Sequence, residues 1–563
     1  MNEQILNWLR RGHLTILLLV ALGVVAALAC GTGDDGPLAS NQEFRLRIAA
    51  DPGTLDPQLA SVAEEISIVK QLFQGLFTYD ENLNVVPAVA LELPTKENGG
   101  ISEDGLTYTI NLRQNAKWSD GQPVTAYQFQ YALQRLFDPE AGAQGRYFSF
   151  YTAIAGADAA VSGEGPVDGV DVTALDDYTL QIKLDREQPT LTVLLALWPA
   201  SPLRQDLLAL YGDAWTEPAN FVGNGPFVLV ENRLGQRLVL EANTQYRGDV
   251  QPTLQRLVYT IIPEDSAALL AYQNGEIDMT DIPLADSARF ADDPEQVRFA
   301  QLETLAVFYN HQQAPFDDPL VGQAFSRAID REAYVTAVRG GVGTPALGWL
   351  PPGMPGADAS IGQDLSFHPD FAQTLLTEAG YPDGEGFPTV TITVTDDATD
   401  RLTAEFLQGQ LSEHLGVDIQ IETLEAGAFF DRFFVGDFQM TWFGWFADYA
   451  DPENWLPLQF GSEGGMNVIG YSNPDVDDLF ALAATEIDYD KRLALYDQAH
   501  RMIIADQAVT PVFHSERNYL VKPHVAGLVT TALDAQPGDW FTSSVRILET
   551  EADAQPPASE PDE

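Results

Sequence analysis

The sequence of 563 residues contains a single cysteine, Cys30. One cysteine cannot form a disulfide within the chain, and it cannot supply the thiolates that a cysteine-rich metal site requires. Histidine is also scarce, and none of the seven lies three or four residues from another, the spacing that places two ligands on one face of a helix. The sequence therefore predicts no metal site and no other cofactor.

Basic residues are greatly outnumbered, with 30 Lys and Arg against 82 Asp and Glu and a formal net charge of −52. Such a surface repels nucleic acid and anionic lipid headgroups, so we expect no nucleic-acid partner. One interpretation is an acidic surface that only keeps the protein soluble. The other is steering of cationic solutes toward the protein, which salt would screen.

The sequence motifs of several enzyme classes are also missing. It has no Gly-x-x-x-x-Gly-Lys-Ser/Thr phosphate-binding loop, no His-Glu-x-x-His helix and no Gly-x-Ser-x-Gly nucleophile turn. Because catalytic groups can converge from distant positions, a peptidase stays an alternative. We expect a protein that is not an enzyme.

The first 30 residues have the pattern of an export signal. Two arginines precede an apolar stretch from Leu14 to Leu28, which is too short to span a membrane comfortably, and small residues flank Cys30. A cysteine in this place resembles the lipobox of bacterial lipoproteins, whose thiol is acylated and becomes the first residue of the mature protein. We therefore predict a lipoprotein signal peptide at 1–30 and lipidation of Cys30. An uncleaved anchor and ordinary signal cleavage are alternatives, and both export the protein.

The length exceeds what one hydrophobic core supports, so we expect two or more packed lobes. Apolar and polar residues alternate as in strands over 44–48, 107–112 and 178–184, while 371–379 and 402–415 have apolar residues at helical spacing. Strands and helices in alternation predict α/β lobes.

Two segments outside these lobes have a different composition. Residues 31–43 are small, polar and rich in turn formers, which predicts a flexible tether. Residues 549–563 are acidic and rich in proline, which predicts a disordered acidic tail. The folded body is expected to span about 44–548.

Several segments of this body resemble a known family. The most specific is Lys117-Trp118-Ser119-Asp120-Gly121-Gln122-Pro123-Val124-Thr125-Ala126. The others are 51–57, 72–77, 106–113, 224–227, 275–278 and 444–452. Together they resemble the extracellular solute-binding proteins, family 5, of bacterial ABC importers, and within that family the oligopeptide-binding branch.

The resemblance implies a two-lobed, periplasmic-binding-protein-like α/β fold of type II with an additional subdomain. A ligand cleft between the lobes would close on a hinge, and the importer would read the closed form as a sign of occupancy. The implied parts are lobe I (44–73, 199–302 and 515–548), the additional subdomain (74–198) and lobe II (303–514), with hinge crossings near 303–307 and 512–516.

The resemblance also implies a peptide site. In the family, an Asp at the position of Asp448 pairs with the α-ammonium of the bound peptide, and an enclosed carboxylate needs such a partner with three donors. Main-chain hydrogen bonds, as in strand addition, would hold any peptide backbone regardless of its sequence. The other residues implied at the ligand are Ser61, Val62, Ala63, Trp442, Gly444, Trp445 and Phe446.

This chain departs from the family at the other end of the peptide. Where a well-known oligopeptide binder has basic residues facing the C-terminal carboxylate, this chain has Trp442 and Asp400, with Arg401 adjacent. Peptide length is therefore open, and a nickel chelate, a sugar or another solute is an alternative ligand. A solvated loop aspartate at Asp448, and ordinary core packing of the nearby aromatic residues, are the structural alternatives.

The function implied by the resemblance is that of a substrate-binding lipoprotein. It would capture oligopeptides outside the cell and deliver them to the permease and ATPase of an ABC importer. We expect a monomer that is anchored by Cys30 at the outer face of the cytoplasmic membrane or lies in the periplasm. A lipoprotein that senses peptides without transport, and an exported peptidase, are the competing hypotheses.

Overall fold

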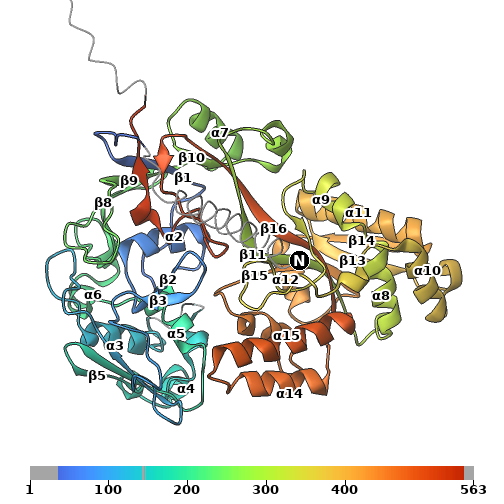
Figure 1. Cartoon of the computed structure of the whole chain (residues 1–563), viewed down its shortest axis with the longest axis horizontal. Helices are drawn as coiled ribbons and strands as arrows, with labels where there is room; N and C mark the ends of the chain where they lie inside the picture. Colours follow the sequence, from blue (N-terminus) through green and yellow to red (C-terminus); the bar gives the residue numbers. More distant parts are fainter. Residues whose placement is uncertain (1–35, 142–144, 146, 551–563) are drawn as a thin grey trace, which may run out of the picture.

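The structure, a computed structural model, describes residues 36–141, 145 and 147–550. Two lobes lie side by side along the longest axis of the molecule (Figure 1). The predicted signal peptide and lipidation site Cys30 lie outside the described residues, as does the predicted tail after residue 550. Every helix in the described part of the chain falls short of the length and apolarity that a membrane crossing requires.

The first lobe is built on a four-stranded sheet in the order β1-β9-β8-β7. In β1, Phe44, Leu46 and Ile48 are buried and alternate with partly exposed residues, so one face of the strand packs into the core. The helix α2 packs its apolar face against the same core. The elements are β1 (Glu43–Ile48), α2 (Ala63–Leu72), α6 (Gln205–Tyr211), β7 (Phe227–Arg233), β8 (Arg237–Ala242), β9 (Arg256–Ile261) and α7 (Asp265–Gln273).

A smaller unit beside this sheet contains a three-stranded antiparallel sheet in the order β4-β6-β5. The helix α3 begins after Thr125, whose backbone and hydroxyl both donate to the side-chain oxygen of Gln128. The strands predicted over 107–112 and 178–184 are present as β4 and β6. The elements are β2 (Phe77–Tyr79), β3 (Val85–Pro87), β4 (Thr107–Asn111), α3 (Ala126–Arg135), α4 (Ala157–Val161), β5 (Val172–Asp176), β6 (Thr179–Lys183) and α5 (Leu191–Leu194).

The second lobe surrounds a seven-stranded mixed sheet in the order β10-β16-β11-β15-β13-β14, with β12 paired to β16. The helices predicted over 371–379 and 402–415 correspond to α10 and α11. The elements are α8 (Pro319–Ala328), α9 (Arg331–Ala337), β12 (Thr344–Pro345), α10 (Pro369–Glu378), β13 (Val390–Thr395), α11 (Ala398–Leu415), β14 (Ile419–Leu424), α12 (Ala426–Phe433), β15 (Met440–Phe446), α13 (Leu456–Phe460), α14 (Pro474–Ala483) and α15 (Tyr489–Ala505).

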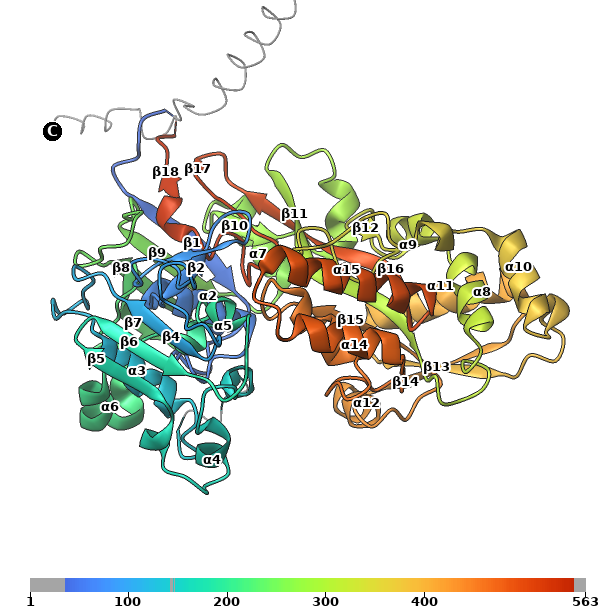
Figure 2. The ribbon, with the colours of Figure 1, turned by 60° about the horizontal axis from the view of Figure 1, so that its bottom comes forward.

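Two long antiparallel strands, β11 (Gln296–Tyr309) and β16 (Val509–Val521), run from one lobe into the other (Figure 2). At the first lobe β16 also pairs with β10 (Met279–Asp281), and in the second lobe β11 pairs with β15. The β11–β16 register shifts twice within residues 300–306 of β11. Such irregularities interrupt the ladder and bend the strand, so the connection between the lobes is locally weakened there.

The described part of the predicted tether, residues 37–43, makes hydrogen bonds with the C-terminal segment of the folded body. The backbone N–H of Ala39 and the side-chain amide of Gln42 both donate to the carbonyl of Ile547, at 2.9 and 2.7 Å. Glu549 N–H donates to the carbonyl of Pro37 at 2.8 Å. Ile547 belongs to β18 (Arg546–Ile547), which pairs with β17 (Val525–Ala526). These partners lie more than 500 residues away, and local composition does not encode them.

Candidate ligand-binding cleft

A cavity of about 290 Å³ lies where the two lobes face each other. The start of α2 contributes Ser61 and Ala63 from the first lobe. The end of β15 contributes Phe446, and Asp448 follows it from the second lobe. The strand β16, which joins the lobes, contributes Arg517. Side chains from both lobes and from the connection between them therefore surround one space.

The loop before α2 has its backbone donors already bound. Glu65 Oε2 accepts hydrogen bonds from the N–H groups of Ser61 at 2.8 Å and Val62 at 3.4 Å, while Ile66 N–H donates to the carbonyl of Val62 at 3.0 Å. A carboxylate in this position caps the free N–H groups at the start of the helix. In this form of the protein, the N–H groups of Ser61 and Val62 are thus not free for a peptide backbone.

Asp448 lies directly after β15 and is held by one neighbour. Its backbone N–H donates to Asn454 Oδ1 at 2.9 Å, and Asn454 Nδ2 donates to Asp448 Oδ2 at 3.0 Å. Burial raises the pKa of Asp448, and the hydrogen bond from Asn454 only partly offsets this effect. No cation lies within 4.0 Å of this carboxylate among the described residues. The site can therefore accept a cationic donor from a ligand.

The turn that follows Asp448 is anchored by a buried ion pair. Asp451 accepts two hydrogen bonds from the guanidinium of Arg492, at 2.8 and 2.6 Å. The two side chains are 0% and 4% exposed. The hydroxyl of Tyr449 donates to Glu453 in the same turn. This turn holds Asn454, and through it Asp448, in place.

Two basic side chains line the cavity. Lys70 Nζ lies 3.2 Å from Asp539 and 3.9 Å from the centre of the Trp540 ring, so its charge is compensated within the protein. Arg517 has a single hydrogen bond, a long one of 3.4 Å to the hydroxyl of Tyr519, and forms no ion pair with any described residue. The guanidinium of Arg517 therefore lies in the cleft without an ion-pair partner among the described residues.

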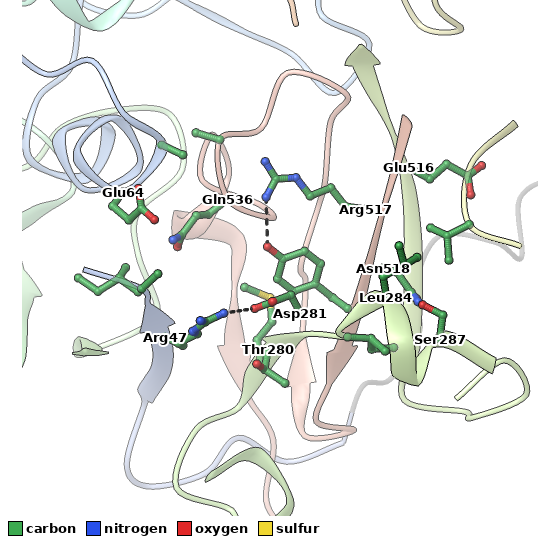
Figure 3. Close-up of a pocket in the computed structure, with 18 of the residues that line it drawn as sticks. Arg47, Glu64, Thr280, Asp281, Leu284, Ser287, Glu516, Arg517, Asn518 and Gln536 are labelled. Atoms are coloured by element: carbon green, nitrogen blue, oxygen red, sulfur yellow. Dashed lines mark hydrogen bonds and ion pairs between the residues drawn. The ribbon is translucent and has the colours of Figure 1, made fainter. Parts of the chain in front are cut away.

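A second cavity, of about 300 Å³, continues from the first and shares Ala63, Arg517 and Ala535 with it. Figure 3 shows the side chains of Arg517 and Gln536 among those that line this cavity. The guanidinium of Arg517, from β16, donates to the hydroxyl of Tyr519. At the floor of the cavity, Arg47 donates to Asp281 at 2.6 Å. Polar side chains form much of this wall, so the space suits a hydrated ligand with polar groups.

Four of the predicted ligand residues line the first cavity: Ser61, Ala63, Phe446 and Asp448. Val62 is not among the residues that line this cavity, and it is 51% exposed.

Three other predicted residues lie in or behind the sheet. Trp442 is buried in the core of the second lobe, 5.6 Å from the ring of Tyr334. Gly444 and Trp445 pair with β11, and the indole N–H of Trp445 donates to Asn454 at 3.4 Å. Trp445 therefore supports the residue that holds Asp448, and it does not form a wall of this cavity.

Sequence reasoning missed Lys70, Gln301, Asn454, Arg517 and Trp540. Only Arg517 carried a signal, because it is a basic residue of an acidic chain and directly follows the expected hinge crossing at 512–516. The others come from segments without a motif, and only the fold brings them to the cleft.

Comparison with known proteins agrees with this architecture. A sequence model of the family described as bacterial extracellular solute-binding proteins, family 5 Middle, matches residues 84–467. The periplasmic oligopeptide-binding protein OppA of Escherichia coli is 31% identical over 532 residues, which cover 92% of this chain and 96% of that protein. The probable deoxycholate-binding periplasmic protein YgiS of Escherichia coli is 31% identical over 520 residues, which cover 91% and 95%.

Two solved structures of the murein tripeptide-binding protein MppA differ in their likeness to this one. The unliganded open form gives a TM-score of 0.81 at 29% identity, covering 92% of this chain and 99% of that one. A structure of the Escherichia coli protein gives 0.69 at 30% identity, covering 91% and 100%. At nearly the same identity and coverage, this structure is more similar to the unliganded open form than to the second MppA structure.

Fold, family match and relatives lead to one assignment. Two lobes joined by long strands enclose a cleft, and the family that has this sequence pattern binds solutes outside the cell. The chain belongs to the bacterial extracellular solute-binding proteins of family 5.

Proposed function

We propose that the protein captures oligopeptides outside the cell and delivers them to the permease and ATPase of an ABC importer. The observation that carries this proposal is the carboxylate of Asp448, which faces the interlobe cavity without a cationic partner among the described residues. A peptide supplies the missing partner through its free α-ammonium. OppA and MppA, relatives by sequence and structure, are named for binding oligopeptides and murein peptides.

In this proposal the peptide lies between the two lobes. Asp448 binds its α-ammonium, and Phe446 with the neighbouring backbone of Gly444 and Trp445 faces the first residues of the peptide. Ser61, Val62 and Ala63 approach from the other lobe when it closes. Glu65 occupies two of their N–H groups in the open form, so these groups contribute only if closure changes the loop. Trp442 stabilises the strand from the core of the second lobe.

Closure follows from the connection between the lobes. The proposed lobe I (44–73, 199–302 and 515–548) contains the sheet of β1, β9, β8 and β7, and the proposed subdomain (74–198) contains the sheet of β4, β6 and β5. Lobe II (303–514) is reached only through β11 and β16, whose register irregularities lie near the boundary. Rotation there would bring Asp448 and α2 together over a ligand.

We further propose that Cys30 is acylated and anchors a monomer to the membrane. The family assignment as an extracellular protein supports export. Labelling with a palmitate analogue in a bacterial host tests the anchor: wild-type protein should become labelled and fractionate with membranes, and Cys30→Ser should not. Labelling of both forms, or of neither, contradicts the proposal.

Ligand-free protein obtained by unfolding and refolding tests the ligand class. We expect pools of di- to pentapeptides with free N-termini to raise the melting temperature, because they bind only the folded state. Deoxycholate, nickel and sugars serve as comparison ligands, the first because YgiS is named for it. A shift with one of these, and none with any peptide, would overturn the peptide proposal.

A further inference from the structure

We propose that the same cavity contains a carboxylate subsite, formed by Arg517, Gln301 and Trp540, that selects ligands whose anionic group lies close to their ammonium. This inference rests on the proposed function and adds to it a second charged contact. It is carried by two hydrogen-bond donors that have no acceptor in the described part of the protein, and by a guanidinium that has only one long hydrogen bond there.

The three donors come from three different segments and have one property in common. Gln301 Nε2 and Trp540 Nε1 are buried and make no hydrogen bond. Arg517 forms no ion pair and has one hydrogen bond of 3.4 Å. All three residues line the cavity that Asp448 also lines. Leaving buried donors without acceptors is costly, so an acceptor on the ligand would be stabilised there.

The charge of the protein makes the position of Arg517 unusual. Acidic side chains outnumber basic ones by 82 to 30, yet no carboxylate lies within 4.0 Å of this guanidinium among the described residues. Glu303 also lines the cavity, but it does not pair with Arg517. A carboxylate brought by the ligand can therefore form a charge-assisted, bidentate hydrogen bond without displacing an internal partner.

The ionised groups beneath the subsite do not cancel its positive potential. Lys70 and Asp539 pair at 3.2 Å below the ring of Trp540. Burial, together with the charge of Asp539, raises the pKa of Asp534 to about 7, so Asp534 holds its proton much of the time near neutral pH. The Lys70, Asp539 and Asp534 group is then close to neutral, so it adds little to the charge that Arg517 presents.

Strand pairing indicates how far apart the two charged contacts lie. Ala447 N–H donates to the carbonyl of Leu302, which places Asp448 beside residue 301 of β11, and Arg517 pairs with Phe299 on the other side of that strand. Two residues along a strand and two strand spacings across it give a separation of Cα atoms on the order of 10 Å. Gln301 lies between the two.

This separation fits a short zwitterion. The long side chain of Arg517 shortens the gap, and an extended di- or tripeptide spans about 7–10 Å between its ends. The carboxylate has two sources with the same chemistry: the C-terminus of such a short peptide, or an acidic side chain near the N-terminus of a longer one. Both present an anion beside Gln301 and Arg517.

Calorimetric titration with matched peptides tests the subsite. The ligands are Ala-Ala-Ala, its C-terminal amide, Ala-Glu-Ala-Ala-amide and Ala-Gln-Ala-Ala-amide. For the wild-type protein we expect the free acid, or the glutamate peptide, to bind at least tenfold more tightly than its neutral partner. Whichever pair shows the difference identifies the source of the carboxylate.

The variant Arg517→Gln should abolish this preference, while Arg233→Gln, which removes a positive charge from an exposed side chain on β7, should keep it. Gln301→Leu is a second variant with an unchanged charge, and it should reduce the preference several-fold. Melting temperatures confirm that each variant is folded. Equal affinity for charged and neutral partners in the wild-type protein, or an unchanged preference in Arg517→Gln, would overturn the subsite.

Failure of the subsite is distinguishable from failure of the proposed function. If peptides bind the wild-type protein and need Asp448 but not Arg517, only the subsite is wrong. If none of the four peptides binds the wild-type protein, both are wrong.

Discussion

Two aspartates three residues apart in the same turn have opposite surroundings. Asp451 is 0% exposed and forms a two-pronged ion pair with Arg492. Asp448 faces the interlobe cavity, and its only side-chain partner among the described residues is the neutral amide of Asn454. A carboxylate with a cation inside the protein stabilises the fold, whereas a carboxylate without one is available for a ligand.

Two arginines, Arg492 and Arg517, differ in the same way as the two aspartates. Arg492 is buried beside Asp451, whereas Arg517 lines the cleft and has no carboxylate of the described residues within 4.0 Å of its guanidinium. The pattern separates residues that build the site from residues that meet the ligand, and each prediction below tests one side of that separation.

The largest effect on stability is expected from Asp451→Ala. This change leaves the guanidinium of Arg492 buried without its partner, so the free energy of unfolding should fall by about 3–5 kcal/mol. Urea unfolding measures the difference. In the double variant Asp451→Leu with Arg492→Met, apolar packing should recover much of the loss. If Asp451→Ala lowers the free energy of unfolding no more than Asp448→Asn does, the proposed contrast between the two aspartates is wrong.

Asp448→Asn should behave in the opposite way. Stability should change by less than about 1 kcal/mol, because no internal ion pair is lost and burial of a charge is relieved. Affinity for peptides with a free N-terminus should fall by about 2–4 kcal/mol, since the α-ammonium loses its carboxylate. Calorimetry and urea unfolding on the same samples measure both quantities. A large loss of stability with unchanged affinity would show that Asp448 stabilises the fold and does not bind the ligand.

Asp534 adds a third case, a buried carboxylate next to both a carboxylate and a cation. Its pKa is about 7 in the folded protein and about 3.9 in an unfolded chain. Between these values the folded state holds a proton that the unfolded state releases, so its contribution to stability is lost as the pH rises from about 4 to about 7.

Asp534→Asn removes this titration. Between pH 5 and pH 8, we expect the variant to lose about 1–3 kcal/mol less stability than the wild-type protein. Asn can still accept hydrogen bonds from Thr531 and Gly538 through its side-chain oxygen, which limits other effects. Urea unfolding at the two pH values gives the slope. The same change in the free energy of unfolding between the two pH values in both proteins would contradict the raised pKa of Asp534.

Asn454→Ala should have the smallest effect. It removes one hydrogen bond to the carboxylate of Asp448, so peptide affinity at pH 7 should fall by about 1 kcal/mol. The same change should raise the pKa of Asp448 further, because the amide lowers it. Affinity should then begin to weaken at a higher pH than in the wild-type protein as the solution is acidified. A uniform loss at every pH would indicate a purely structural role.

The strands and helices that were predicted from periodicity are those with regular burial. β1, β4, β6, α10 and α11 alternate between core and solvent with the period of their secondary structure, so the sequence alone indicates them. The contacts of residues 37–43 were not predictable from local composition, because Ala39 and Gln42 bind Ile547, a residue far away along the chain.

The sequence predicted site residues only where they lie together in one recognisable segment. Asp448 and Phe446 lie in a single motif, and the structure places both at the cavity. Trp442 lies earlier in the same strand, within the core of the second lobe and against the ring of Tyr334, and only the fold reveals this position. Gln301, Arg517 and Trp540 come together through strand pairing and a C-terminal loop, which no local pattern describes.

The central claim is that Asp448 pairs with the α-ammonium of a peptide, and four affinities test it most directly. Calorimetry gives the affinity of a tripeptide and of its N-acetylated form for the wild-type protein and for Asp448→Asn. The account predicts that acetylation weakens binding to the wild-type protein by at least thirtyfold and changes binding to the variant by less than threefold. The same loss on acetylation in both proteins would contradict the pairing.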